Sequence, residues 1–285
     1  MARTMKFVFH LFRHYGSYNE VGDEGGYTSD ACLTLTGGVT EIISLKSNKP
    51  DPHRLFHRLK QILEKGSHIN CSLLQETTRT RNTGLIGGHA YSLTDTRLVT
   101  RRNGEKVPLL RIRNPQGYFQ WKGKWSDMSS EWMTVVEGDK IHNIREDGEF
   151  WMSAVDFLQQ FSQIMICCRR PDCIADGSTK PMRLAKDGYV PLFLQLVQKT
   201  ETLQNDSMHC DLFRIKRVDE KTKTLHVLKI ENSARNNHYL PRLHTNFRFK
   251  LKPGRYLAVP STEKKGINKE FLIRVFCASP VLQCR

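Results

Sequence analysis

Apolar residues recur at helical spacing in an early segment of the chain. The residues that share this spacing are Leu55, Phe56, Leu59, Ile62 and Leu63. Asp51-Pro52 precedes them and Gly66 follows them. Aspartate before proline is typical of a helix start, and glycine just after the last apolar residue is typical of a helix end. This pattern predicts an amphipathic helix over about residues 52–65.

A second helix and several strands are predicted farther along the chain. Ser153, with Asp156 three residues later, forms a capping pattern that predicts a helix from there through about Phe161. Between the two helices apolar and polar residues alternate, which is typical of half-buried strands. Asn103-Gly104 is a hairpin-turn signal between two of them. The predicted strands cover residues 87–94, 97–102 and 107–113.

After residue 166 the pattern consists of alternating strands separated by turn signals such as Lys252-Pro253-Gly254. These strands cover residues 192–198, 210–218, 224–230, 246–250, 254–260 and 271–277. Their spacing favours a β-sandwich. Residues 169–183 contain Pro, Asp, Gly and Ser and are predicted to be a linker. We therefore expect an α+β chain with domains at residues 1–168 and 184–285.

Length and composition agree with two modest domains. The 285 residues are 39% hydrophobic, which is enough material for two cores. No apolar run approaches the length of a membrane-spanning helix, and residues 5–14 are too short and too interrupted for a signal peptide. The 8 cysteines have no framework spacing, so we expect reduced thiols and a cytoplasmic location.

The chain is strongly basic, with a net charge of +15. Such a charge can indicate a polyanionic partner. The basic residues are scattered, however, and there is neither a basic helix nor a basic motif interleaved with aromatic residues. We therefore expect a solvated surface and no nucleic-acid partner. A weaker alternative is that basic faces within residues 213–270 approach anionic phospholipid.

Two short strings supply candidate chemistry. They place His89 in Gly-His-Ala-Tyr and Asn114 in Arg-Asn-Pro, at neighbouring predicted strands. In a Cys-His-Asn centre the imidazole stabilises a thiolate and transfers protons, while the asparagine holds the ring in the correct tautomer. The chain has 11 histidines, and a lone histidine is more often a surface or packing residue than a catalyst.

The context of Asn114 carries a family resemblance. Trp121, Gly123, Trp125 and Asp127 follow at fixed offsets, then Trp132 and the string EDGEFWMS at residues 146–153. These strings resemble the second protease subdomain of the calpains, which are calcium-dependent, papain-like cysteine endopeptidases. The resemblance covers about residues 15–166. Residues 255–262 and 270–276 resemble the C2-like domain that follows the protease core in that family.

The resemblance implies a fold and two catalytic residues. The expected fold is the antiparallel, β-rich half of a papain-like cysteine protease, followed by a C2-like β-sandwich. His89 matches the catalytic histidine of the family, and Asn114 matches its catalytic asparagine. The nucleophilic cysteine of the family belongs to a preceding subdomain, at a helix start, and these 285 residues contain no counterpart. We therefore expect a partial chain that alone does not hydrolyse peptides.

The cysteines in the chain do not replace that nucleophile. Cys32 and Cys71 precede His89 but lack the Cys-Trp helix start, so we interpret both as small buried apolar residues. Three further cysteines crowd a loop-like stretch without a histidine pair at zinc spacing, namely Cys167, Cys168 and Cys173. Metal binding is not expected at that stretch.

The resemblance also implies a calcium site. Asp127, Asp147 and Glu149 match calcium ligands of the family, and the main-chain carbonyl of Arg145 is a further candidate. Calcium prefers six to eight oxygen ligands with several carboxylates. Gln120 stands where the family has a glutamate ligand, so we expect lower affinity. The alternative is that Asp-Gly-Glu is an ordinary polar turn.

Gln116 departs from the family pattern, which has tryptophan at this position. In calpains the indole shields the His–Asn hydrogen bond and, without calcium, wedges between the two protease halves. Glutamine is shorter and polar, so the resemblance implies a wetter hydrogen bond and a lost or altered tryptophan gate.

Three functional interpretations remain open at this point. The favoured one is a calcium-dependent cysteine endopeptidase that acts on protein substrates, with a cysteine-bearing half or a regulatory subunit as partner. The second is a non-catalytic calpain homologue that binds proteins. The third is a calcium- or phospholipid-binding module in which the remaining active-site residues are only structural.

Overall fold

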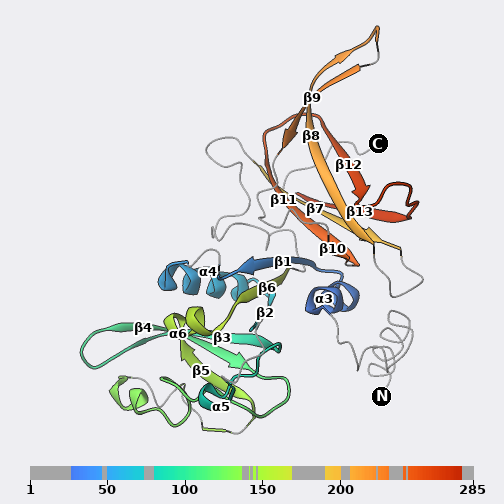
Figure 1. Cartoon of the computed structure of the whole chain (residues 1–285). Helices are drawn as coiled ribbons and strands as arrows, with labels where there is room; N and C mark the ends of the chain where they lie inside the picture. Colours follow the sequence, from blue (N-terminus) through green and yellow to red (C-terminus); the bar gives the residue numbers. More distant parts are fainter. Residues whose placement is uncertain are drawn as a thin grey trace. The chain divides into compact units, whose positions relative to one another are not determined.

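The computed structural model describes residues 27–46, 50–73, 80–136, 141, 144–145, 147–168, 190–199, 206–222, 224–230, 240–241 and 243–277. Two compact units are present (Figure 1). One unit consists of residues 40–169, and the other groups residues before 40 with those from 170 onward. The predicted linker, residues 169–183, lies outside the described residues. The predicted domain limits 1–168 and 184–285 stay a prediction.

The unit of residues 40–169 is built on a six-stranded sheet with the order β1-β6-β2-β3-β4-β5. The strands are β1 (Val39–Ser44), β2 (His68–Ser72), β3 (Ala90–Thr100), β4 (Lys106–Arg113), β5 (Glu149–Ser153) and β6 (Gln163–Cys168). Four helices accompany them: α4 (Pro52–Glu64), α5 (Thr80–Thr83), the 3-10 helix η1 (Ser130–Thr134) and α6 (Ala154–Gln160). Helices α4 and α6 contact each other and strand β4.

The two helices predicted from the sequence form where expected. At the start of α4, the Asp51 carboxylate accepts a hydrogen bond from the backbone N–H of Arg54, 2.9 Å away. At the start of α6, the Ser153 hydroxyl accepts from the backbone N–H of Asp156 at 3.0 Å. Both caps satisfy donors that the first helical turn leaves free. No helix in the described part of the chain has the length and apolarity that crossing a membrane requires.

Strands β3 and β4 form the hairpin that matters for the site. The two predicted strands at residues 87–94 and 97–102 are one strand, β3, with a register shift between Leu93 and Asp95. A bulge of this kind changes the alternation of side chains without ending the strand, which explains the predicted break. Gly104 adopts a φ of 86° in the turn that follows, a conformation that favours glycine.

A tryptophan-rich core lies at the β3–β4 end of this sheet. Trp125 and Trp132 pack edge to face, with ring centroids 5.1 Å apart. The cluster consists of Val99, Val107, Leu109, Trp125, Trp132, Val135 and Trp151. Strand β6 is buried as well, and it contains Cys167 and Cys168. The loop predicted for those two cysteines is therefore wrong, while Cys173 lies outside the described residues.

The other unit contains a β-sandwich. One sheet has the order β10-β8-β12 with β9 also paired to β8, and the other has the order β11-β7-β13. The strands are β7 (Val190–Gln198), β8 (Ser207–Asp219), β9 (Thr224–Ile230), β10 (Leu240–Pro241), β11 (His244–Leu251), β12 (Tyr256–Thr262) and β13 (Phe271–Cys277). Side chains of β7, β8 and β11 form its core. The predicted α+β fold with a sandwich is confirmed.

Helix α3 (Thr28–Thr36) belongs to the same compact unit as the sandwich. The buried imidazole of His244 lies 3.0 Å from the Asp30 carboxylate, measured from Nδ1 to Oδ1. The Arg274 guanidinium donates a hydrogen bond to the Gly37 carbonyl at 2.7 Å. These contacts attach the helix to β11 and β13.

Candidate functional site

The β3–β4 hairpin brings His89 and Asn114 together at its open end. His89 lies one residue before β3, and Asn114 lies one residue after β4. The pairing of Ser92 with Arg113 aligns the two strands next to this point. His89 Nε2 lies 2.8 Å from Asn114 Oδ1. The two residues flank the strands rather than lying on them, yet their predicted proximity is correct.

The hydrogen bonds around Asn114 determine which atom donates in the contact between His89 and Asn114. The Asn114 Nδ2 group donates to the Tyr118 carbonyl and to the Phe119 carbonyl, the latter at 3.2 Å. Oδ1 therefore points toward His89, and it also accepts from the backbone N–H of Gln116 at 3.1 Å. Because an amide oxygen only accepts, His89 Nε2 carries the proton in the neutral ring. Nδ1 is then left with a lone pair that can accept a proton.

The backbone of Asn114 is held as firmly as its side chain. Its N–H donates to the Gly148 carbonyl at 2.8 Å, and its carbonyl accepts from Gly117 at 3.0 Å. The side chain is fully buried. Phe119, whose carbonyl binds the Asn114 amide, has a positive φ of 60°, which is uncommon for a non-glycine residue. The loop after β4 thus holds a strained residue and orients the amide.

Tyr91 supports His89 from within β3. The two rings pack edge to face with centroids 5.0 Å apart, and the tyrosine is 1% exposed. Its hydroxyl accepts from the backbone N–H of Ile86 at 2.7 Å. Burial raises the pKa of Tyr91 to about 12, so the phenol stays neutral in ordinary buffers. Sequence reasoning did not identify this residue, although its position two residues after His89 places both on one face of an extended segment.

The described cysteines agree with a structural role. Cys71 is buried in β2, and its Sγ atom lies 3.9 Å from the Tyr91 carbonyl. Burial raises the pKa of the Cys71 thiol well above its usual value, which disfavours the nucleophilic thiolate. Cys32 is only half-buried, in helix α3. The expectation of burial is therefore correct for Cys71 and too strong for Cys32.

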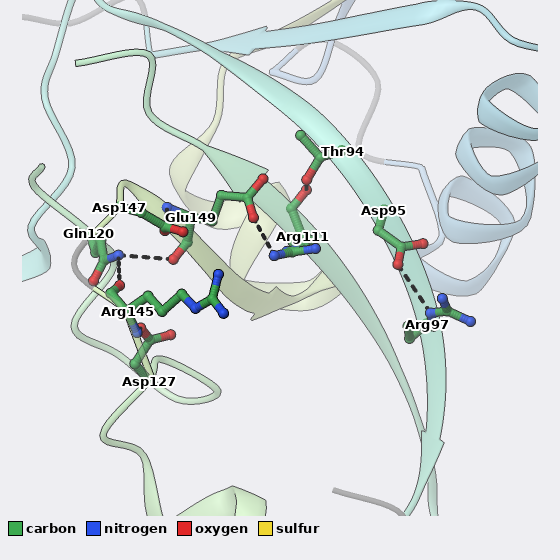
Figure 2. Close-up of polar contacts among 9 residues, drawn as sticks. All are labelled: Thr94, Asp95, Arg97, Arg111, Gln120, Asp127, Arg145, Asp147 and Glu149. Atoms are coloured by element: carbon green, nitrogen blue, oxygen red, sulfur yellow. Dashed lines mark hydrogen bonds and ion pairs between the residues drawn. The ribbon is translucent and has the colours of Figure 1, made fainter. Parts of the chain in front are cut away.

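Four of the five residues of the predicted calcium site line one small polar cavity, and the fifth, Gln120, bonds to two of them. Figure 2 shows them where the loop after β4 meets the loop that leads into β5. The cavity measures about 20 Å³, which is close to the space of a single water. Its lining consists of Arg111, Ile141, Phe150 and Trp151 together with the candidate residues Asp127, Arg145, Asp147 and Glu149. Gln120 contacts this group through hydrogen bonds.

Several candidate ligand atoms of these residues already bond to groups of the chain. Gln120 Nε2 donates to the Arg145 carbonyl at 2.6 Å and to the Glu149 carbonyl at 3.0 Å. The Glu149 carboxylate pairs with the Arg111 guanidinium. Among the described residues, no three His, Cys, Asp or Glu side chains gather as a metal-binding group. A calcium ion needs oxygens in the place that the Gln120 amide nitrogen fills, so this arrangement does not fit the ion.

The two remaining carboxylates accept hydrogen bonds from backbone N–H groups of the segment that leads into β5. An Asp127 oxygen accepts from the backbone N–H of Arg145 at 3.3 Å, and an Asp147 oxygen accepts from the backbone N–H of Glu149 at 3.0 Å. The second contact is the local hydrogen bond of an Asx turn. The turn that the sequence offered as an alternative is therefore present.

Comparison with known proteins places these features in a family. The model of the calpain family cysteine protease matches residues 11–168, and that of calpain large subunit domain III matches residues 177–276. Calpain-A of Drosophila melanogaster is 31% identical over 92% of this chain and 38% of its own length. The calpain-1 catalytic subunit of Rattus norvegicus is 30% identical over 92% of this chain and 44% of its own.

The calpain-2 catalytic subunit of Homo sapiens is 32% identical over 88% of this chain and 44% of its own length. The chain thus spans less than half the length of these relatives. The protease model alone covers more than half of the chain. This chain therefore belongs to the calpain family of cysteine proteases.

Proposed function

We propose that this chain supplies the histidine and asparagine of a cysteine-type endopeptidase that performs limited proteolysis of protein substrates. The observation that carries the proposal is the 2.8 Å contact between His89 Nε2 and Asn114 Oδ1. The asparagine amide is fixed by two backbone carbonyls, so the ring is held in one tautomer. The nucleophile comes from a cysteine outside the residues described above.

The chemistry assigned to the pair follows from its hydrogen bonds. With Nε2–H donated to Asn114, Nδ1 of His89 takes the thiol proton and forms a thiolate–imidazolium pair. The imidazolium then returns the proton to the leaving amine as the thioester forms. Asn114 stabilises the protonated ring through its amide oxygen and adds no charge. A carboxylate in its place would alter the balance of that ion pair.

Gln116 leaves the His89–Asn114 pair more open to water than a tryptophan at that position would. Gln116, Tyr118 and Phe119 are all exposed, and the two aromatic rings contact each other with centroids 5.0 Å apart. Water competes with an exposed hydrogen bond, so we expect weaker orientation of His89 than in a shielded site. Replacing Gln116 with tryptophan should raise kcat in the assembled enzyme.

The test is reconstitution with a separately produced cysteine-bearing half from one of the matched relatives. We expect peptide hydrolysis in the mixture, and loss of about 100-fold or more on His89→Ala because general acid–base catalysis is removed. Asn114→Ala should lower kcat with little change in KM. His53→Ala is the matched control, since this exposed histidine lies on helix α4. Hydrolysis that survives His89→Ala unchanged would overturn the proposal.

The chain by itself should not hydrolyse peptides. Cys71 is buried with a raised pKa, so it offers no thiolate to His89. A thiol-inhibited peptidase activity that co-purifies with the isolated chain and is lost on His89→Ala would contradict this expectation.

Other expectations from the sequence stay proposals. They are a cytoplasmic location, a regulatory subunit as partner, an anionic phospholipid partner and a calcium dependence of activity that arises from calcium bound away from Gln120. The cysteines that the structure describes are reduced thiols, which supports a reducing compartment. The family match favours a protease over a purely non-catalytic binding module.

A further inference from the structure

We propose that the side-chain amide of Gln120 joins two loops by hydrogen bonds, without calcium, and thereby positions Asn114. We call these hydrogen bonds the clasp. The first loop is residues 118–122 after β4, and the second, which leads into the start of β5, contributes Arg145 and residues 147–149. The inference rests on the proposed function only in that Asn114 is taken to orient His89. The clasp itself concerns the conformation of the chain and can be tested without peptidase activity.

The first observation is the position of the Gln120 amide. Its nitrogen donates to the carbonyl oxygens of Arg145 and Glu149, at 2.6 and 3.0 Å. Figure 2 shows both bonds reaching from one loop to the other. Two carbonyl oxygens that point at one place repel each other unless a donor or cation lies between them. The amide NH₂ group supplies that donor from within the chain.

The second observation is that both joined loops hold Asn114. The loop of residues 118–122 contributes the Phe119 carbonyl, which accepts from the Asn114 amide at 3.2 Å. The second loop contributes the Gly148 carbonyl, which accepts from the Asn114 backbone N–H at 2.8 Å. A change in the distance between the loops would therefore move Asn114 away from His89. Gln120 is a positioning residue, since it acts on His89 through Asn114.

The third observation concerns charge. Glu149, whose carbonyl accepts one of the Gln120 bonds, pairs through its carboxylate with Arg111 from the neighbouring strand β4. Figure 2 shows this ion pair beside the Gln120 bonds. The clasp engages the carbonyls of Arg145 and Glu149, and the ion pair engages the Glu149 carboxylate, so groups of this chain bond to all three. An added divalent cation would have to displace both.

Gln120→Glu is the decisive variant. A carboxylate at this position faces two carbonyl oxygens with no proton to donate, so the loops should separate. Hydrogen exchange of the full chain, read by mass spectrometry, should show exchange about tenfold faster in peptides covering residues 114–122 and 147–153, as expected for loss of the hydrogen bonds that join the loops. Millimolar calcium should restore protection in this variant, because the cation can bridge the carboxylate and the carbonyls.

The wild-type chain is the other arm of the experiment. We expect its exchange in the same peptides to be the same with calcium and with a chelator. Gln159→Glu is the matched control, since it makes the same change at an exposed position of helix α6. It should show neither faster exchange at the two loops nor a response to calcium there.

Two results would overturn the proposal. One is calcium-dependent protection of the two loops in the wild-type chain, which would mean that the ion and not the amide joins them. The other is unchanged exchange in Gln120→Glu without calcium, which would mean that the amide bonds do not hold the loops. Neither result depends on reconstituted peptidase activity, so failure of the clasp and failure of the proposed function are distinguishable.

Discussion

At the residue scale, Gly148 occupies a place that no other residue can take without moving Asn114. Its φ of 83° favours glycine, and a Cβ atom there would lie 2.6 Å from the Asn114 carbonyl oxygen. Gly148→Ala should therefore destabilise the chain by about 1–3 kcal/mol and displace the Asn114 loop. Urea unfolding gives the first quantity, and reconstituted peptidase activity reports the second.

Gly104→Ala is the control that separates the backbone strain of a positive φ from the steric clash with Asn114. Gly104 has a similar φ of 86°, but no atom lies within 4 Å of its added Cβ. Its substitution should cost only the backbone strain and should leave reconstituted activity unchanged. Equal effects of the two substitutions on activity would show that the contact between Gly148 and Asn114 is unimportant.

A second residue-scale prediction concerns thiol reactivity. Burial raises the pKa of Cys71, so its thiol stays protonated until the pH passes that raised value. Alkylation near pH 8 should therefore modify the half-buried Cys32 and Cys277 before Cys71. Peptide mapping by mass spectrometry gives the order. Rapid modification of Cys71 in the folded chain would identify it as a reactive thiol and reopen the question of the nucleophile.

The candidate dyad could be predicted from sequence because its residue types carry the chemistry. His89 and Asn114 stand in strings that predict both their roles and their proximity. The groups that orient Asn114 could not be predicted, since the Tyr118, Phe119 and Gly148 carbonyls are backbone atoms that any residue possesses. The Gln120 contacts were missed because a lost charge was considered while a gained donor was not.

At the element scale, β8 and β9 form a ribbon that extends past the sandwich. Strand β12 pairs with β8 from Met208 to Arg214, whereas β9 pairs with β8 as far as Asp219. Apolar side chains of this ribbon are exposed, with Leu225, Val227 and Leu228 at 41%, 41% and 47%. Basic residues share the ribbon, among them Lys216, Arg217, Lys221 and Lys229.

The ribbon is the element to test for the expected phospholipid partner. Leu228→Asp removes apolar area and adds a charge of the sign of the lipid, so binding to phosphatidylserine vesicles should weaken about tenfold. Co-sedimentation with phosphatidylserine and phosphatidylcholine vesicles measures it. Leu98→Asp on β3 is the control, because that leucine is 41% exposed on a different sheet. Equal binding of both vesicle types would remove the lipid from the partners.

Element boundaries show where sequence patterns suffice. The six predicted strands of the sandwich lie within three residues of their predicted limits, because each alternates and ends at a turn signal, whereas the two-residue strand β10 was not predicted. Helix α3 was not predicted, since its apolar residues share no single face and its buried residues are Ser29 and Asp30. Strand β6 was missed because it is buried on both faces and shows no alternation.

At the scale of the whole molecule, the two compact units have separate cores. Tryptophan fluorescence distinguishes the unfolding of one unit from that of the other. All 4 tryptophans lie between residues 121 and 151. Tryptophan fluorescence therefore reports unfolding of the protease unit alone, while far-ultraviolet circular dichroism reports both units. Leu109 and Phe249 are fully buried representatives of the two cores.

Cavity-forming substitutions should affect the two probes differently. Leu109→Ala should lower the free energy of unfolding seen by fluorescence by about 2–5 kcal/mol. Phe249→Ala, at a similar cost, should change the circular dichroism transition and leave the fluorescence midpoint in place. A shift of the fluorescence midpoint by Phe249→Ala would show that the units unfold as one cooperative body.

The placement of the dyad within one hairpin also affects how the chain folds. His89 and Asn114 are 25 residues apart, and the loop that separates them is the hairpin itself. Contacts of such short range form early and rapidly, because little chain entropy is lost when the loop closes. The pairing of β3 with β4, which brings the histidine and the asparagine side by side, can therefore form on a nascent chain, whereas the Gly148 contact that fixes Asn114 forms only once the segment before β5 is in place.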